Sequence, residues 1–257
     1  MTLLQINNLS HYFGALKAVD GFNITLEEGE LVGLIGPNGA GKTTIFNLVT
    51  GAYRASEGEI VFQGQNLVGK PPHAINAVGI SRTFQTIRLW NMMSTLDNVR
   101  VAHHAHLDYS LLDAFLGLPR YWRRERDITE ESLALLRLFG LDRYADEPVK
   151  NLPYGAQRRV EIVRALASKP KLLLLDEPAA GMNPQEIGAL MDFIRWIRDR
   201  FSLTIWLIEH QMRLVMNVCE RIKVLDFGAT IAEGTPEQVR NDPRVIEAYL
   251  GEQGAVI

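Results

Sequence analysis

The fold of this chain is decided by the stretch Gly36-Pro37-Asn38-Gly39-Ala40-Gly41-Lys42-Thr43-Thr44. It fits G-x-x-x-x-G-K-[ST], the phosphate-binding loop. The apolar run at 31–35 before it predicts a buried strand, and residues 43–50 after it predict a helix that Gly51 ends. The alternative is a glycine turn with an accidental lysine, but the strand–loop–helix context favours nucleotide binding.

The residue types of this loop suit phosphate chemistry. Glycines let successive backbone N–H groups turn inward around an anion, and the helix N-terminus adds its positive dipole end. Lys42 can reach the β- and γ-phosphates of a nucleotide, and the Thr43 hydroxyl can ligate Mg²⁺. The sequence therefore predicts a site for a magnesium nucleotide.

Length and composition exclude several classes of protein. At 257 residues and 47% hydrophobic, the chain can bury one large core, or one core with a subdomain. The net charge of −3 gives no case for nucleic-acid binding, and the single cysteine, Cys219, excludes an internal disulfide and fits a reducing compartment. No apolar run approaches the roughly 18 residues of a membrane span, and the N-terminus lacks a secretion signal. We therefore expect a soluble, cytoplasmic protein that reaches a membrane only through a partner.

The N-terminal part reads as an antiparallel β layer near the phosphate loop. Alternating apolar residues around 4–6 and 24–26, and the segment 58–62, predict its strands. We expect His11-Tyr12-Phe13-Gly14 between the first two strands. An aromatic ring there either stacks on an adenine or is an ordinary half-buried side chain, and residue type leaves both open.

The middle of the chain is predicted to be mainly helical. Short helices are expected at 72–78 and 96–105, a strand at 80–84, and helices at 130–139 and 156–168. Residues 107–130 read as the least regular part. Four arginines surround Trp122 there, at positions 120, 123, 124 and 126. They form either a solvated face or a contact surface for a membrane-embedded partner or lipid headgroups.

The C-terminal part alternates strands and helices. Buried strands are predicted at 172–175 and 204–208, a long helix at 184–200, strands near 222–225 and 230–232, and helices after Thr235 and Asp242. Strands that alternate with helices around a phosphate loop indicate a mostly parallel sheet.

Polar residues follow three of the predicted strands, at the edge where open α/β sheets bind ligands. Asp176 suits the Mg²⁺ shell, and Glu177 can polarise a water aimed at the γ-phosphate, although a polar turn stopped by Pro178 is the alternative. His210 ends the next strand and can hydrogen-bond the γ-phosphate. Gln85 can touch Mg²⁺ or water, but residue type alone argues against that role.

With the phosphate loop, Gln85, Asp176-Glu177 and His210 in this order, the chain resembles the ATP-binding subunits of ABC transporters. Within that family it is most similar to the branched-chain amino acid uptake type, over nearly its whole length. The similarity also rests on Arg82-Thr83-Phe84-Gln85, the long region 86–130, Leu152-Pro153-Tyr154-Gly155, Ala179-Ala180-Gly181-Met182-Asn183-Pro184, Ile208-Glu209-His210 and the ending Asn241-Asp242-Pro243 with Tyr249-Leu250-Gly251-Glu252.

This resemblance implies a single ABC ATPase domain over residues 1–257. The implied fold is α/β, a P-loop NTPase core of mostly parallel sheet flanked by helices, with an antiparallel β layer and a helical subdomain. The core and the β layer would occupy about 1–85 and 160–240, the helical subdomain about 86–159, and a C-terminal helical tail about 235–257.

The resemblance also assigns site residues. Phe13 becomes the adenine-stacking aromatic, with Tyr12 as the fallback; Gln85 becomes the Mg²⁺-sensing glutamine, against the expectation from residue type. Glu177 becomes the catalytic base and His210 the switch histidine. The family signature L-S-G-G-Q falls on residues 152–156, so that Leu152, Tyr154 and Gly155 would reach across a dimer to the γ-phosphate bound by the partner.

Two residues depart from the family pattern. The signature serine is Pro153, which has neither a hydroxyl nor an N–H to donate. The dimer-loop aspartate is Asn183, which keeps hydrogen bonding but loses the charge. Both departures favour an asymmetric pair with a different ATPase subunit.

The implied function is ATP hydrolysis, with ATP and Mg²⁺, that energises uptake of branched-chain or related amino acids. The implied partners are a second ABC ATPase subunit (the same or a paralogue), two membrane permeases and, indirectly, a substrate-binding protein, at the inner face of the plasma membrane. Export of lipid or lipopolysaccharide is the alternative among transporters. A soluble ABC ATPase acting on nucleic acid or ribosomes would carry a coiled-coil insertion or two fused cassettes, and a P-loop kinase would need an acceptor site and a lid.

Overall fold

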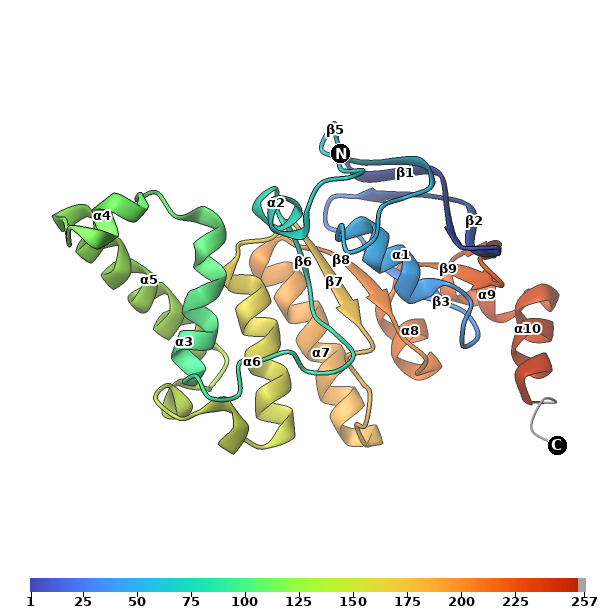
Figure 1. Cartoon of the computed structure of the whole chain (residues 1–257). Coiled ribbons are helices and arrows are strands. Elements are labelled where there is room, and N and C mark those ends of the chain that lie inside the picture. The colour runs from blue at the N-terminus through green and yellow to red at the C-terminus, as the bar shows by residue number, and fades with distance from the viewer. Residues whose placement is uncertain (254–257) are drawn as a thin grey trace. The chain divides into compact units, whose positions relative to one another are not determined.

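The structure, a computed structural model of the chain, describes residues 1–253. The helical tail expected at 235–257 therefore lies partly outside the described residues, at 254–257. The chain divides into two compact units (Figure 1). We call Met1–Ile75 with the described residues from Lys171 onward the sheet unit, and Asn76–Pro170 the helical unit.

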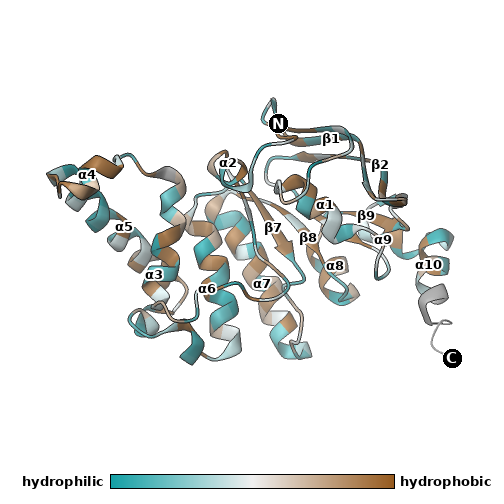
Figure 2. Ribbon diagram, in the orientation of Figure 1, coloured by the Kyte–Doolittle hydropathy of each residue, from teal (hydrophilic) through white to brown (hydrophobic). Residues whose placement is uncertain are grey.

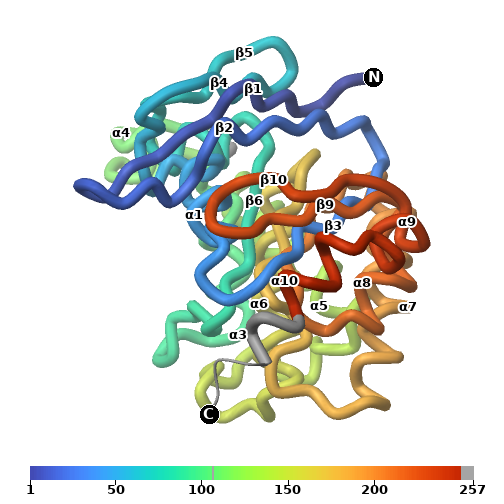
Figure 3. The backbone as a smooth tube through the Cα atoms, turned by 90° about the vertical axis from the view of Figure 1, so that its right-hand side faces the viewer, coloured from blue at the N-terminus to red at the C-terminus, as the bar shows by residue number. Residues whose placement is uncertain are grey.

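An antiparallel sheet forms the N-terminal part of the sheet unit, as predicted, and its strands lie together in Figure 3. Its order is β2-β1-β4-β5, with β1 at Thr2–Phe13, β2 at Leu16–Glu27, β4 at Glu57–Phe62 and β5 at Gln65–Asn66. The prediction that residues 11–14 separate the first two strands is wrong, because β1 continues to Phe13, which pairs with Leu16. The hairpin needs only Gly14, at φ +59°, and Ala15 to reverse the chain.

The second sheet of this unit is mostly parallel, as predicted, with the order β10-β9-β3-β8-β7. Its strands are β3 (Leu31–Ile35), β7 (Leu172–Asp176), β8 (Thr204–Ile208), β9 (Arg221–Asp226) and the antiparallel β10 (Ala229–Gly234). Every residue of β3, β7 and β8 is buried, which explains their unbroken apolar runs (Figure 2). Trp206 of β8 anchors the core, with its ring 5.2 Å from that of Phe46.

Five helices complete the described part of the sheet unit: α1 (Lys42–Val49), α7 (Pro184–Phe201), α8 (Met212–Val218), α9 (Pro236–Arg240) and α10 (Pro243–Gln253). Because β3, β7 and β8 run parallel, their carboxyl ends share one edge of the sheet. The phosphate loop, Asp176-Glu177 and Glu209-His210 therefore follow neighbouring strands at that edge.

The helical unit contains β6 (Ile80–Arg82), α3 (Thr95–Arg100), η1 (Val101–His106), α4 (Leu111–Phe115), α5 (Pro119–Leu138), η2 (Asp142–Tyr144), η3 (Val149–Asn151) and α6 (Tyr154–Ala167), while α2 (Pro72–Ala77) crosses its boundary. The prediction that residues 107–130 are irregular is largely wrong. The helix expected at 130–139 is the second half of α5, which begins at Pro119, a residue suited to a first helical turn.

The four arginines of the basic cluster lie on α5. The Arg124 side chain is largely buried, and its guanidinium lies 3.2 Å from the carboxylate of Glu131. Trp122 and the neighbouring Phe115 are exposed. None of the helices within residues 1–253 is both long enough and apolar enough to cross a membrane.

Candidate functional site

The phosphate loop, Gly36–Thr44, connects β3 to α1, and three of its glycines have positive φ: Gly36 at 148°, Gly39 at 76° and Gly41 at 101°. A Cβ at Gly36 would overlap the carbonyl oxygen of Leu225, and one at Gly41 would lie 2.5 Å from that of Ala18. Gly36 and Gly41 are therefore required both by conformation and by close packing, and Gly39 by conformation alone.

Lys42 is held at the centre of this loop. Its side chain is 5% exposed, and its Nζ donates to the carbonyl oxygens of Gly36 at 2.6 Å and Pro37 at 2.7 Å. These are neutral acceptors for a buried ammonium. A phosphate oxygen carries negative charge and would be a stronger acceptor for this ammonium, so the loop fits a phosphorylated ligand.

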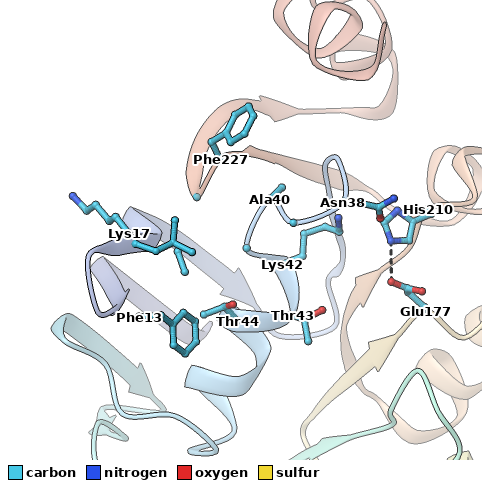
Figure 4. A pocket seen from close by; sticks show the side chains of 15 residues that line it. Phe13, Lys17, Asn38, Ala40, Lys42, Thr43, Thr44, Glu177, His210 and Phe227 are labelled. Atoms are coloured by element: carbon cyan, nitrogen blue, oxygen red, sulfur yellow. Dashed lines mark hydrogen bonds and ion pairs between the residues drawn. The ribbon is translucent and has the colours of Figure 1, made fainter. Parts of the chain in front are cut away.

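A cavity of about 400 Å³ opens over the loop (Figure 4). It is lined by predicted site residues, namely Phe13, Asn38, Gly39, Ala40, Gly41, Lys42, Thr43, Thr44, Glu177 and His210. It is also lined by residues that sequence reasoning missed, namely Leu16, Lys17, Ala18, Phe227 and Gly228. Of the two aromatic candidates, Phe13 is the one that lines the cavity, and its ring packs edge-on against His11 and Tyr53.

The missed residues come from two hairpins that close on the loop. The Gly228 N–H, between β9 and β10, donates to the carbonyl oxygen of Ala40 at 3.0 Å, and its own carbonyl accepts from the Asp20 N–H at 2.9 Å. Phe227 is 89% exposed at the opposite side of the cavity from Phe13 (Figure 4). No sequence pattern joins these turns to residues 36–44, because the pairing arises only when the strands are in place.

The strand ends bring the predicted polar residues of this unit together. Asp176 is buried at the end of β7. Glu177 has a positive φ of 48° and donates its N–H to the carbonyl oxygen of Ile208 at 2.9 Å. Its Oε1 lies 2.8 Å from Nε2 of His210, the dashed contact in Figure 4. A carboxylate and an imidazole thus meet at the rim of the cavity.

Glu209, beside His210, is a further buried carboxylate, and sequence reasoning predicted no role for it. It is 2% exposed and accepts backbone N–H groups from Ala179 at 2.6 Å, His210 at 3.0 Å and Gln211 at 3.2 Å. Burial raises the pKa of its carboxyl above the ordinary value, while the three N–H groups act in the opposite direction.

Two of the predicted site residues carry oxygen ligands that suit magnesium. The Thr43 hydroxyl and the Asp176 carboxylate are the hard oxygen ligands that Mg²⁺ prefers. Within residues 1–253 there is no group of three or more His, Cys, Asp or Glu side chains that could hold a metal ion.

Comparison with known proteins identifies the family. A family model described as "ABC transporter" matches residues 19–180, and one described as "Branched-chain amino acid ATP-binding cassette transporter" matches residues 229–255. The chain belongs to the ABC transporter ATPases. Such an ABC ATPase is expected to bind and hydrolyse nucleotide, which agrees with the cavity over the phosphate loop.

The similarity of this ABC ATPase to its relatives extends over nearly whole chains. It is 45% identical to the high-affinity branched-chain amino acid transport ATP-binding protein LivG of Escherichia coli K12, over 97% of this chain and 98% of that protein. It is 44% identical to BraF of Pseudomonas aeruginosa over the same shares. Among solved structures, an ATP-binding cassette in its ADP conformation is 32% identical with a TM-score of 0.84, over 98% of this chain and 99% of that one.

The remaining predicted residues of the ABC ATPase lie in the helical unit. Gln85 follows β6 in a loop that a buried ion pair of α6 holds. Glu161 Oε1 accepts the backbone N–H groups of Phe84 at 3.4 Å and Arg88 at 3.3 Å. Arg158 Nη1 donates to the carbonyl oxygen of Phe84 at 2.5 Å and to Glu161 Oε2 at 2.7 Å.

The signature-like segment starts α6. Pro153 is the N-cap without a side-chain cap, and its carbonyl oxygen accepts the N–H groups of Ala156 at 2.9 Å and Gln157 at 3.0 Å. Leu152 is buried, whereas Tyr154 and Gly155 are exposed in the first turn. Asn183, the other departure from the family, is the N-cap of α7 in the sheet unit.

Proposed function

We propose that this chain is the ATP-hydrolysing subunit of an ABC importer that energises uptake of branched-chain or related amino acids. The observation that supports this most strongly is the 45% identity with LivG over nearly the full length of both chains. The match of residues 229–255 to the branched-chain cassette model supports the same substrate class independently of the ATPase core.

In this proposal the cavity of the sheet unit receives ATP. Backbone N–H groups of residues 36–44 and the Lys42 ammonium bind the phosphates, and Phe13 stacks on the adenine. Thr43 and Asp176 of the sheet unit would hold Mg²⁺, which would neutralise charge on the phosphates. Gln85 of the helical unit is proposed as the Mg²⁺-sensing glutamine of the family. Lys42 and Asp176 are both buried, and hydrogen bonds to a charged group are stronger in a low-dielectric interior than in water.

Glu177 is proposed as the general base that takes the proton of the attacking water. His210, whose Nε2 lies 2.8 Å from the carboxylate, is proposed to orient Glu177 and, when ATP is bound, to contact the γ-phosphate. The positive φ of Glu177 supports a functional role, because strained backbone conformations gather at active sites.

Leu152, Tyr154 and Gly155 are proposed to complete the ATP site of a second ABC ATPase subunit, the same or a paralogue. Since Pro153 offers no donor, the α6 N-terminus and the Gly155 region carry this contact, and a paralogous partner is favoured. Two membrane permeases and, through them, a substrate-binding protein are the further partners, at the inner face of the plasma membrane.

Two substitutions test the ATPase assignment. Glu177→Gln should slow ATP hydrolysis about 100-fold or more and leave an ATP-bound dimer that gel filtration detects. Lys42→Ala should weaken nucleotide affinity at least about tenfold in equilibrium titration. The exposed Glu237→Gln is the matched control and should leave both quantities unchanged. Full hydrolysis by Glu177→Gln would remove this residue from the role of base.

The substrate class needs a separate test in cells that carry the cognate permeases. Loss of the gene should abolish uptake of radiolabelled leucine, and the wild-type gene, but not Lys42→Ala, should restore it. Undiminished uptake of leucine, isoleucine and valine after deletion would refute amino acid import and leave lipid export as the alternative.

A further inference from the structure

The loop that carries Glu177 and the loop that carries His210 are joined by one buried side chain. Glu209 Oε1 accepts the N–H of Ala179, two residues after Glu177, at 2.6 Å. Glu209 Oε2 accepts the N–H of His210 at 3.0 Å and that of Gln211 at 3.2 Å. Each carboxylate oxygen thus serves a different loop, and the side chain is the bridge between them.

From this contact pattern we infer that Glu209 is a positioning residue for the loops after β7 and β8. It sets the distance between Glu177 and His210. The inference rests on the proposed roles of Glu177 and His210. It goes beyond them because Glu209 is buried and is not among the residues that line the cavity, so that it acts through the backbone of the two loops.

The conformation of Glu177 explains why such a bridge is needed. At φ +48° the residue has the left-handed backbone that side chains other than glycine disfavour, by about 1–2 kcal/mol. A strained residue keeps its conformation only when its surroundings fix it. The Glu177 N–H is bound to Ile208 O on one side, and Ala179 is bound to Glu209 on the other.

The chemistry of a carboxylate suits this position. An ionised glutamate is an acceptor at both oxygens, and here the N–H groups of Ala179, His210 and Gln211 donate to them at hydrogen-bond distance. A glutamine of the same shape has one acceptor oxygen and one NH₂ donor. It can hold the loop after β7 or the loop after β8, but not both.

The test is therefore Glu209→Gln in the full-length protein, with Glu30→Gln as the matched control. Glu30 is also largely buried, accepts the Glu27 N–H at 3.0 Å and pairs with Arg221, but it lies before β3, at the opposite end of that strand from the phosphate loop. Both substitutions replace one acceptor oxygen by an NH₂ group and remove one charge. Glu30→Gln also weakens the ion pair with Arg221, so the control disturbs its surroundings at least as much, but away from the phosphate loop.

We expect Glu209→Gln to lower kcat for ATP about 10- to 100-fold, because small displacements of reacting groups have effects of that size. Nucleotide affinity should change less than about twofold, since the phosphate loop is untouched. Glu30→Gln should keep its kcat. Equal loss of kcat in both variants, or a loss of affinity that matches the loss of kcat, would show a general structural effect and overturn the inference.

Amide hydrogen exchange gives a readout that does not depend on catalysis. In Glu209→Gln, exchange should accelerate in peptides that cover 177–182 and 209–212, and not in Glu30→Gln. Accelerated exchange with an unchanged kcat would overturn the positioning role. If Glu177→Gln keeps its activity while Glu209→Gln loses it, the assigned base is wrong and the bridge still stands, so the two failures are distinguishable.

Discussion

The loop of the sheet unit that follows Glu177 and the loop of the helical unit around Gln85 are both held by a buried glutamate, but the two glutamates are satisfied in different ways. Glu209 is bound by three backbone N–H groups. Glu161 is fully buried, binds two backbone N–H groups, and is also paired with Arg158, which is 2% exposed.

Because the two glutamates have different partners, the two loops should respond differently to substitution. Arg158 and Glu161 stand one turn apart on α6, and both contact the Phe84 backbone, so α6 and the Gln85 loop are tied together by a charge pair. Glu209 instead depends on the backbone geometry of two loops. The first arrangement is sensitive to loss of a charge, and the second to loss of an acceptor.

The largest effect is expected from breaking the charge pair. Arg158→Met should lower the free energy of unfolding by about 3–5 kcal/mol, because it leaves the Glu161 carboxylate buried without its cation. Urea denaturation measures this loss. The exposed Arg123→Met on α5 is the control and should stay within about 0.5 kcal/mol of wild type.

A double variant sharpens the same comparison. Arg158→Met with Glu161→Gln should be less destabilised than the sum of the two single variants, because the pair no longer contains an uncompensated charge. A purely additive result, or a single-variant loss below about 1 kcal/mol, would show that the ion pair does not hold the loop.

A smaller effect is expected at the far end of the loop after β7. Asn183 Oδ1 accepts the N–H groups of Gln185 and Glu186, both at 3.0 Å, and the Glu186 carboxylate accepts the Asn183 N–H at 2.8 Å. Asn183→Ala should therefore cost about 1 kcal/mol by thermal or urea unfolding. Asn183→Asp keeps the cap and should be close to wild type; an equal loss in both would exclude capping as the role of Asn183.

The sequence predicted those parts whose signals are local. The glycine and lysine pattern at 36–44 and the apolar runs that end at Asp176 and before His210 predicted the strands and the edge at which they meet. The first half of α5 was missed because its arginines hide the apolar periodicity, although Pro119 was a usable signal for a helix start.

The two glutamate bridges could not be predicted, for a physical reason. A glutamate in a sequence is most often a solvated side chain, and only its partners decide otherwise. Glu209 meets Ala179 from 30 positions away, and Glu161 meets Phe84 from 77 positions away. The same holds for Phe227 and Gly228, which join the cavity through a hairpin distant from residues 36–44 in sequence.

The smallest expected effect is the pH dependence that the Glu209 carboxyl gives to the free energy of unfolding. Burial raises the pKa of its carboxyl from the ordinary value of 4.5, and the nearby Glu177 raises it further, against the three N–H groups. The folded state therefore holds the proton more tightly than the unfolded state. The stability contribution of this group is complete below the unfolded pKa and is lost as pH rises through the folded pKa.

Urea unfolding of wild type and Glu209→Gln from about pH 4 to about pH 7 measures this dependence. Since the glutamine does not titrate, the stability of wild type relative to the variant should fall as the pH rises. A relative stability that instead rises with pH would mean that the three N–H groups outweigh burial. Glu209 would then be a permanently ionised bridge, closer in behaviour to the paired Glu161 than its backbone partners indicate.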